Sequence, residues 1–339
     1  MKVLITGGAG FIGCNAASRL LARGAEVVLI DDLSRPGAER NLEWLKSQGD
    51  FEFHRLDVRD FSGVRSVFHT HRNASLALHL AAQVAVTTSI ADPRTDFEIN
   101  ALGTLNVLEA AHQAGLEAPL IYASTNKVYG EMRDIPIVDS GRRYEYANLP
   151  YGIPEEYPLD FHSPYGCSKG SADQYVRDYH RIYGLNTVVF RQSCIYGPRQ
   201  FGIEDQGWVA WFMIAVETGR PLTIYGDGKQ VRDLLQVEDL LDAFEAAARN
   251  IESTAGMVYN LGGGPGNAVS LIDVLEFLEQ RIGRRIERAG APARAGDQRV
   301  YVSDIRRAER DFGWTPKVDW RTGLKLLHGW VADNRRLFA

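Results

Sequence analysis

Two side chains with complementary proton chemistry, Tyr165 and Lys169, stand four residues apart in a segment that opens with Ser163 and Pro164. Serine followed by proline is typical of the first turn of a helix, and residues four apart on a helix share one face. A free tyrosine, with a pKa of about 10, is a poor base at neutral pH. A neighbouring cation lowers that pKa, so the spacing predicts that Tyr165 exchanges a proton with a substrate.

A short polar run, Ser124 and Thr125, follows an apolar segment at 120–123 that predicts a strand. If the helix of Tyr165 meets this strand end, Thr125 can hydrogen-bond the same hydroxyl that Tyr165 deprotonates. A tyrosine and a lysine four apart also occur on ordinary helices, as a core aromatic beside a solvated charge. The catalytic set of Thr125, Tyr165 and Lys169 is therefore predicted from all three residues together, and it suits an alcohol oxidised by a nicotinamide.

Closely spaced glycines near the N-terminus predict a dinucleotide-binding turn. They follow an apolar strand at 3–5 and lead into a helical pattern at 11–23, and they fit both G-x-G-x-x-G and G-x-x-G-x-x-G. A Cβ would block the tight turn and the approach of a pyrophosphate, and the helix N-terminus offers N–H groups to phosphates. The predicted cofactor contacts of this turn are Gly7, Gly10, Phe11, Ile12 and Gly13.

Asp31 ends the second strand pattern, where the dinucleotide fingerprint places a ribose acceptor. A carboxylate bonds a 2′-hydroxyl and repels a 2′-phosphate, so NAD is favoured, although Arg35 leaves NADP open. Ligands of parallel sheets bind beyond the carboxyl ends of the strands, which adds residues that follow two further strand patterns. These additional cofactor contacts are Asp57, Val58, Leu80 and Ala81.

Apolar strand patterns alternate with helical patterns through the first half of the chain. The strands are expected at 3–5, 26–30, 51–54, 76–80, 120–123 and 187–191. Such alternation predicts right-handed βαβ units, and therefore an α/β fold with a doubly wound parallel sheet of the Rossmann type.

The same patterns predict the domains. We expect an NAD-binding domain at 1–190, to which 234–262 returns. The looser pattern at 191–233 and 263–339 predicts a smaller substrate-binding cap. The stretch at 131–161, rich in proline, glycine, tyrosine and charge, is expected to be a surface excursion near the site.

Composition limits the partners and the compartment. The 339 residues carry a formal net charge of −5, whereas nucleic acids and anionic membranes demand a basic face, so neither is an expected partner. The apolar runs are shorter than a membrane span. The three cysteines, Cys14, Cys167 and Cys194, are odd in number and widely separated, which fits a reducing compartment. We therefore expect a cytoplasmic protein.

Several motifs together resemble the extended short-chain dehydrogenase/reductases of the nucleotide-sugar epimerase and dehydratase family. They lie at 6–13, 79–82, 125–130, 165–169, 196–199, 231–233 and 313–316. The resemblance implies a nucleotide-sugar substrate, bound NAD and a homodimer. It also implies that Thr125 assists, that Tyr165 is the base and that Lys169 holds the nicotinamide ribose. The implied substrate contacts are Gln83, Asn126, Cys194, Arg232 and Arg294, of which the two arginines would bind the pyrophosphate.

Two departures from family patterns narrow the reaction. The 4,6-dehydratases carry an Asp-Glu pair where this chain has Asn126 and Lys127, which cannot supply an acid and a carboxylate for water loss. The galactose-type 4-epimerases usually have Asn at the position of Cys194. Segments at 83–90, 124–130, 160–170, 205–209 and 297–300 resemble instead the branch that inverts C2 of CDP-linked hexoses by transient oxidation and hydride return.

Two alternatives stay open from the sequence. A UDP-hexose 4-epimerase would differ only in the carbon that faces the nicotinamide and in the base that the cap accepts. A non-catalytic NAD-binding regulator is the other alternative, but such a protein would have no need of Thr125, Tyr165 and Lys169 together.

Overall fold

The structure, a computed structural model, describes residues 1–293 and 297–338. Its centre is a seven-stranded parallel sheet in the order β12-β8-β5-β4-β1-β2-β3. The strands are β1 Lys2–Thr6, β2 Glu26–Asp31, β3 Glu52–Arg55, β4 Leu76–His79, β5 Leu120–Thr125, β8 Thr187–Gln192 and β12 Val258–Leu261. The prediction of a doubly wound parallel sheet is thus confirmed.

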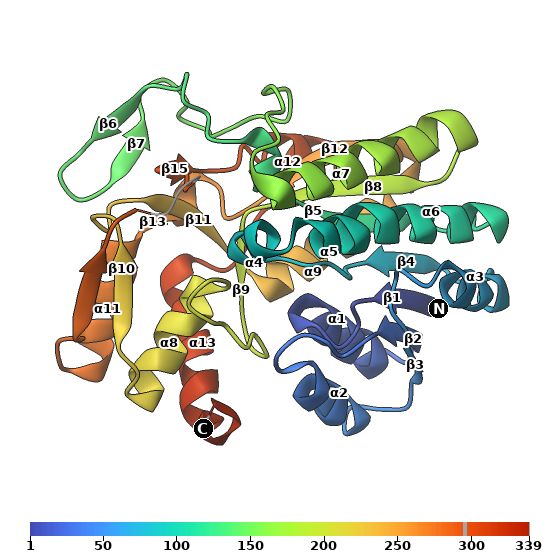
Figure 1. Cartoon of the computed structure of the whole chain (residues 1–339), viewed down its shortest axis with the longest axis horizontal. Helices are drawn as coiled ribbons and strands as arrows, with labels where there is room; N and C mark the ends of the chain where they lie inside the picture. Colours follow the sequence, from blue (N-terminus) through green and yellow to red (C-terminus); the bar gives the residue numbers. More distant parts are fainter. Residues whose placement is uncertain (294–296, 339) are drawn as a thin grey trace.

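Helices cover both faces of this sheet (Figure 1). In β1, Val3 and Ile5 belong to one buried core and Leu4 belongs to the other, because successive side chains of a strand point to opposite faces. The first core is packed by α1 Phe11–Ala22, α9 Val237–Arg249 and α12 Arg306–Phe312. The second is packed by α3 Phe61–Thr70, α6 Gly103–Gln113 and α7 Ser163–Tyr183. Strands buried on both faces explain the unbroken apolar runs of the sequence.

A third core lies beside the carboxyl ends of the strands and is built mainly by the later part of the chain. Its elements are α8 Trp208–Thr218, β10 Leu222–Tyr225, β11 Val231–Gln236, α11 Leu271–Ile282 and α13 Trp320–Asp333. The short strands β9 Cys194–Tyr196, β13 Ala268–Ser270 and β15 Val300–Tyr301 pair around β11, and β14 Arg288–Ala291 pairs with β10. Ser270 and Asp273 form the capping box that begins α11.

Shorter helices and one hairpin complete the described fold. The helices are α2 Ala38–Lys46, α4 Val86–Ala91, α5 Pro93–Phe97 and α10 Ile251–Thr254. The stretch at 131–161 was expected as an irregular excursion, yet it contains β6 Ile137–Asp139 and β7 Tyr144–Tyr146, which pair antiparallel. The hairpin stands out from the body in Figure 1, and Tyr144 Oη donates to Asp227 Oδ2 at 2.6 Å. Strands of three residues are too short to leave a period in the sequence.

None of the helices within the described residues combines the length and the apolar character needed to cross a bilayer.

Candidate active site

The glycine turn between β1 and α1 forms a backbone cradle that side chains would fill. Gly7 has φ of 70°, and its carbonyl accepts a hydrogen bond from the Gly10 N–H at 3.1 Å. A Cβ on Gly13 would lie 2.1 Å from that same carbonyl oxygen. Helix α1 begins at Phe11. No side chain caps its N-terminus and its first turn holds no acidic residue, so its free N–H groups remain available to an anion.

A cleft of about 530 Å³ opens above this turn, at the carboxyl ends of the strands. Every residue predicted to contact the cofactor lines it: Gly7, Gly10, Phe11, Ile12, Gly13, Asp31, Asp57, Val58, Leu80, Ala81, Tyr165 and Lys169. Sequence reasoning missed Asn41, Gln192 and Gln200, which also line the cleft. Each of these three has a buried side-chain atom without a hydrogen-bond partner among the described residues: Oδ1, Nε2 and Oε1, respectively. The cleft therefore fits a polar ligand of dinucleotide type.

Asp31 lies at the edge of this cleft and is held rigidly. Its carboxylate accepts from the Ala9 N–H at 2.9 Å and from the Leu33 N–H at 2.8 Å, and burial raises its pKa. Arg35, the residue that left NADP open, donates instead to Gln206 Oε1 at 2.9 Å. The carboxylate is thus fixed in the wall of the cleft, and its contact with a ribose stays a prediction.

The Tyr165 and Lys169 side chains lie on one face of α7 and are both nearly buried. Lys169 Nζ donates to the Ala123 carbonyl at 2.6 Å and lies 4.3 Å from the centre of the Tyr122 ring. Thr125 ends β5, and its hydroxyl lies near enough to Tyr165 to act to lower the phenol pKa. The predicted catalytic set is therefore brought together in space.

Burial moves the pKa of Tyr165 in the direction opposite to the one that a nearby Lys169 charge favours. Burial raises the pKa of Tyr165 to about 12, which outweighs the lowering effect of the Thr125 hydroxyl. Burial also lowers the pKa of Lys169 to about 7, so this lysine is only partly charged near neutral pH. Because Lys169 is only partly charged, it supplies little positive potential, and the protein alone does not lower the phenol pKa. The lower pKa expected when a positive nicotinamide ring also lies beside Tyr165 stays a prediction.

Helix α7 is fixed to the sheet by a buried ion pair. Arg191 of β8 makes two hydrogen bonds to the Asp173 carboxylate, at 2.9 and 3.0 Å, and both residues are almost fully buried. Ser124 of β5 donates to the same carboxylate at 2.8 Å. Because Asp173 is one turn beyond Lys169, this clamp sets the position of the catalytic face of α7 relative to Thr125.

Gln83 also lines the cleft, but its side-chain amide is engaged within the protein. Nε2 donates to Asp96 Oδ1 at 2.7 Å and to the Ala85 carbonyl at 2.9 Å, and Oε1 accepts from the Ala85 N–H. Asp96 in turn accepts from Ser168 on α7 at 2.5 Å. This network positions the second turn of α7, and it does not favour the predicted substrate contact of Gln83.

A second cavity, of about 620 Å³, adjoins the cleft, and Gln206 lines both. The predicted substrate residues Asn126, Cys194 and Arg232 line it, together with Lys127. Arg294 lies outside the described residues. Sequence reasoning missed the aromatic part of this wall, which contains Trp208, Trp211, Phe212 and Tyr225. The tryptophans of α8 were the one feature of the sequence that could have predicted this wall.

The second cavity contains two cationic side chains, those of Arg232 and Lys127. Arg232 Nη2 donates to Asp297 Oδ1 at 2.7 Å, and Lys127 Nζ lies 4.0 Å from the same oxygen. Desolvation, assisted by the Arg232 charge, lowers the pKa of Lys127 to about 8. Asn126 Nδ2 donates to Gln298 Oε1 at 3.1 Å. Cations beside aromatic rings suit a ligand that carries phosphates and a base.

Cys194 is not an activated nucleophile in this setting. Its Sγ accepts from the Trp208 indole N–H at 3.1 Å, and burial raises the thiol pKa to about 12. The thiol therefore stays protonated at neutral pH, and Cys194 contributes shape and a weak hydrogen-bonding group to the wall.

Comparisons with known proteins agree with this geometry. The family model of the NAD dependent epimerase/dehydratase family matches residues 3–262. The chain is 45% identical over 338 residues to CDP-paratose 2-epimerase of Salmonella typhi, which covers 98% of this chain and 100% of that protein.

Solved structures of similar proteins have the same fold. The UDP-glucose 4-epimerase of Thermus thermophilus in complex with NAD is 35% identical, with a TM-score of 0.80 and 99% coverage of both chains. The dTDP-glucose 4,6-dehydratase DesIV of Streptomyces venezuelae, with NAD bound, is 29% identical, with a TM-score of 0.84 and 99% and 98% coverage. The predictions of an enzyme, of NAD and of the extended short-chain dehydrogenase/reductase resemblance are confirmed. The chain belongs to the NAD dependent epimerase/dehydratase family.

Proposed function

We propose that the protein inverts C2 of a CDP-linked hexose, as in the conversion of CDP-paratose to CDP-tyvelose. The observation that carries this proposal is the 45% identity to CDP-paratose 2-epimerase, which extends over 98% of the chain and so includes both cavities. The junction of the two cavities supports it, because Ser124 lines the cofactor cleft and Asn126 lines the second cavity, with Thr125 between them.

The catalytic roles follow from position. NAD, when bound in the cleft, supplies reversible oxidation of a carbinol carbon. Tyr165 takes the proton of the sugar hydroxyl and later returns it, and Thr125 holds that hydroxyl by a hydrogen bond. Lys169 holds the nicotinamide ribose. The high phenol pKa suits the second half of the cycle, in which Tyr165 must give its proton back to the new alcohol.

The substrate side is built for a charged nucleotide. Arg232 would bind the pyrophosphate, and Arg294 is proposed for the same role. Residues 1–190 with 234–262 would form the cofactor domain, to which α12 is added because it packs against the sheet, and residues 191–233 with the rest of 263–339 would form the cap. Cys194 and Asn126, which both line the second cavity, would contact the sugar.

Oxidation directly at C2 is the favoured route. An alternative route, oxidation at C3 followed by exchange of the C2 proton, needs an acid/base group on each face of the ring. Asn126 cannot act as a base, and Lys127, with a pKa of about 8, provides one face only. Direct oxidation needs only Tyr165 as the proton carrier.

The test is turnover of CDP-paratose, CDP-glucose and UDP-glucose in deuterium oxide, with products identified by mass spectrometry and NMR. We expect a C2 epimer from CDP-paratose without deuterium on carbon. Deuterium fixed at C2 would exclude the direct route. Formation of UDP-galactose from UDP-glucose, with CDP-paratose unchanged, would instead assign the protein to the 4-epimerases.

We also propose a homodimer formed through α5, α6 and α7. Large apolar side chains are exposed on α5, on the helical turn Glu98–Leu102 that leads into α6, and on α7, at Phe97, Leu102, Tyr175, Ile182 and Tyr183, with exposed fractions from 39% to 65%. A second copy of the chain would bury them. Light scattering of the wild type and of Ile182→Glu tests this interface, which is wrong if both have the monomer mass.

The proposed location is the cytoplasm. The structure leaves Cys14, Cys167 and Cys194 as free thiols, which suits a reducing compartment.

A further inference from the structure

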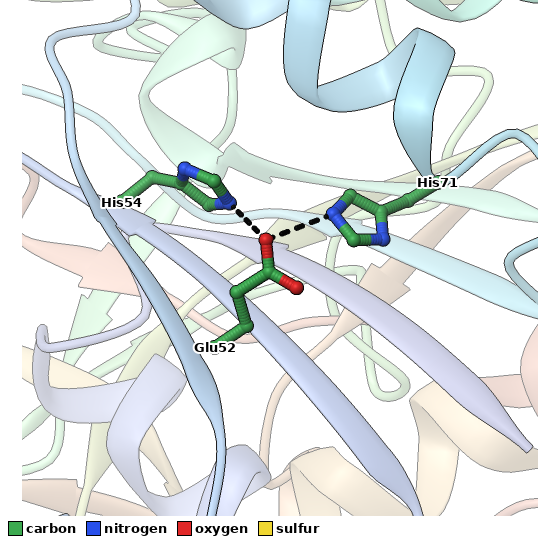
Figure 2. Close-up of side chains that lie close together, drawn as sticks. All are labelled: Glu52, His54 and His71. Carbon is green, nitrogen blue, oxygen red and sulfur yellow. Dashed lines mark hydrogen bonds and ion pairs between the residues drawn. The ribbon is translucent and has the colours of Figure 1, made fainter.

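A cluster of metal-ligand side chains lies at the far edge of the sheet, outside both cavities. Glu52 and His54 are two residues apart on β3, the last strand of the sheet, so their side chains share one face. His71 is the C-cap of α3, which packs nearby. Figure 2 shows the two imidazoles turned toward one oxygen of the Glu52 carboxylate.

Three potential ligand atoms lie close together. Glu52 Oε1 lies 2.7 Å from His54 Nε2 and 3.1 Å from His71 Nε2. All three atoms lie within 4.8 Å of one another, and the two rings meet edge to face with centroids 6.2 Å apart. Among the residues that the structure describes, this is the one such group of three.

We propose that Glu52, His54 and His71 bind a divalent transition-metal ion, with Zn²⁺ the best match. Two imidazoles and a carboxylate are a known zinc ligand set that leaves the fourth tetrahedral position to water. Bond lengths of about 2.0–2.2 Å place tetrahedral ligand atoms roughly 3.3 Å apart, so the present contacts need to open by a few tenths of an ångström. The side chains of Glu52 and His54 are 47% and 33% exposed and can make that movement.

The surroundings of the cluster give a metal ion access and determine how tightly it binds. A cavity of about 440 Å³ beside the cluster gives access from solvent, and the negative end of the α3 dipole lies at His71. Two features oppose tight binding: Arg55 lines the same cavity, and buried His71 Nδ1 has no hydrogen-bond partner in the described residues. Missing outer partners cost about 10–100-fold in metal affinity, so we expect micromolar binding.

The metal would act as a clamp. It would join the end of α3 to the start of β3, whose chain continues into Leu56, Asp57 and Val58 of the cofactor cleft. The cluster does not reach the cleft, so the metal would stabilise the fold without taking part in the reaction. This inference does not depend on the identity of the sugar substrate.

The experiment uses the full chain without an affinity tag, stripped with EDTA and titrated with ZnCl₂ by calorimetry. We expect one Zn²⁺ per chain and a rise in Tm, and CoCl₂ should give the visible absorption of tetrahedral Co²⁺. Glu52→Gln and His54→Gln should each weaken binding by about tenfold or more and lose the Tm shift. His69→Gln, an exposed histidine at the end of α3, is the matched control and should behave as the wild type.

The possible results of this experiment distinguish a specific metal site from its absence. No Zn²⁺ binding, or binding of equal strength in the wild type, Glu52→Gln and His54→Gln, overturns the proposal. Circular dichroism of each variant without metal verifies that it is folded, so a loss of binding reports the ligands. Turnover with and without Zn²⁺ should agree within about twofold, and a large change would contradict the structural role.

Discussion

The two cavities that meet at the end of β5 are built in different ways. The cofactor cleft is organised by backbone elements, namely a glycine turn, the ends of consecutive strands and one helix N-terminus, to which side chains such as Asn41 and Lys169 are added. The second cavity is lined by residues drawn from segments between Val86 and Asp297, with aromatic and charged side chains prominent among them. A turn whose shape is set by backbone sterics recognises what all NAD molecules share, whereas a wall of side chains can change its ligand by substitution. Cofactor identity and substrate identity are therefore separable properties of this molecule.

The largest effect is expected where the two cavities join. Tyr165→Phe removes the acid/base group and keeps the ring, so turnover should fall about 10²–10⁴-fold while nucleotide binding at both sites persists. Turnover and binding of NAD and of the nucleotide sugar are measured separately. Tyr175→Phe, an exposed tyrosine of the same helix, is the control and should keep full activity. Near-normal turnover of Tyr165→Phe would remove the proposed mechanism.

Gly13→Ala should damage the cofactor cleft alone. The added methyl group meets the Gly7 carbonyl at 2.1 Å, and overpacking of this kind costs about 1–3 kcal/mol. We expect lower NAD retention and a lower Tm, measured on the purified protein. In Gly329→Ala the new Cβ has no neighbour within 4 Å, so this variant should match the wild type. Full NAD retention in Gly13→Ala would mean that backbone shape does not govern the cleft.

Arg232→Lys should impair the second cavity. Loss of the forked guanidinium beside Asp297 should raise the KM for the nucleotide sugar about tenfold and leave NAD retention unchanged. Arg288→Lys, at a partly exposed ion pair with Glu279 in the same part of the molecule, is the control. A loss of NAD in Arg232→Lys would break the separation between the two cavities.

The smallest effect is a difference in pH dependence between two lysines. The pKa is lowered from 10.5 to about 7 for Lys169 and to about 8 for Lys127. From each lowered pKa up to about 10.5, the unfolded chain binds a proton that the native protein does not, so each lysine makes the free energy of unfolding rise with pH in that range. The free energy of unfolding of the wild type should rise with pH relative to that of Lys169→Met above about pH 7. Relative to that of Lys127→Met, it should rise only above about pH 8.

Denaturant unfolding of nucleotide-free protein between about pH 6.5 and about pH 9.5 measures these differences. Lys325→Met, on an exposed position of α13, supplies the control for the replacement of a lysine by methionine. Identical pH profiles for Lys169→Met and the wild type would contradict the burial of its ammonium group.

Local patterns were sufficient to predict the fold and the cofactor cleft. The glycine spacing, the strand ends and the Asp31 carboxylate all act within a few residues of their own element, so every predicted cofactor contact lines the cleft. The hairpin of β6 and β7 was missed because three residues carry no period. The engagement of Gln83 with Asp96 was missed because it depends on how two loops meet.

Properties that depend on burial could not be predicted from spacing. The sequence places a lysine one turn from Tyr165, but only the folded structure shows that desolvation controls the charge of both groups. The aromatic wall of Trp208, Trp211 and Tyr225 likewise forms from two separate elements. The approach of His71 to Glu52 has no local signal, because strand and helix end are joined by tertiary packing.

The buried pair of Asp173 and Arg191 has an evolutionary consequence. Replacing one member alone leaves the other as an uncompensated buried charge, at a cost of about 3–5 kcal/mol, whereas exchanging both for well-packed apolar residues can be neutral. Single substitutions at either position therefore lead through unstable intermediates. The ion pair of Arg232 and Asp297 in the wall of the second cavity is more exposed, so single substitutions there cost less, and a lineage with this fold can acquire a new sugar long before it can reposition its catalytic helix.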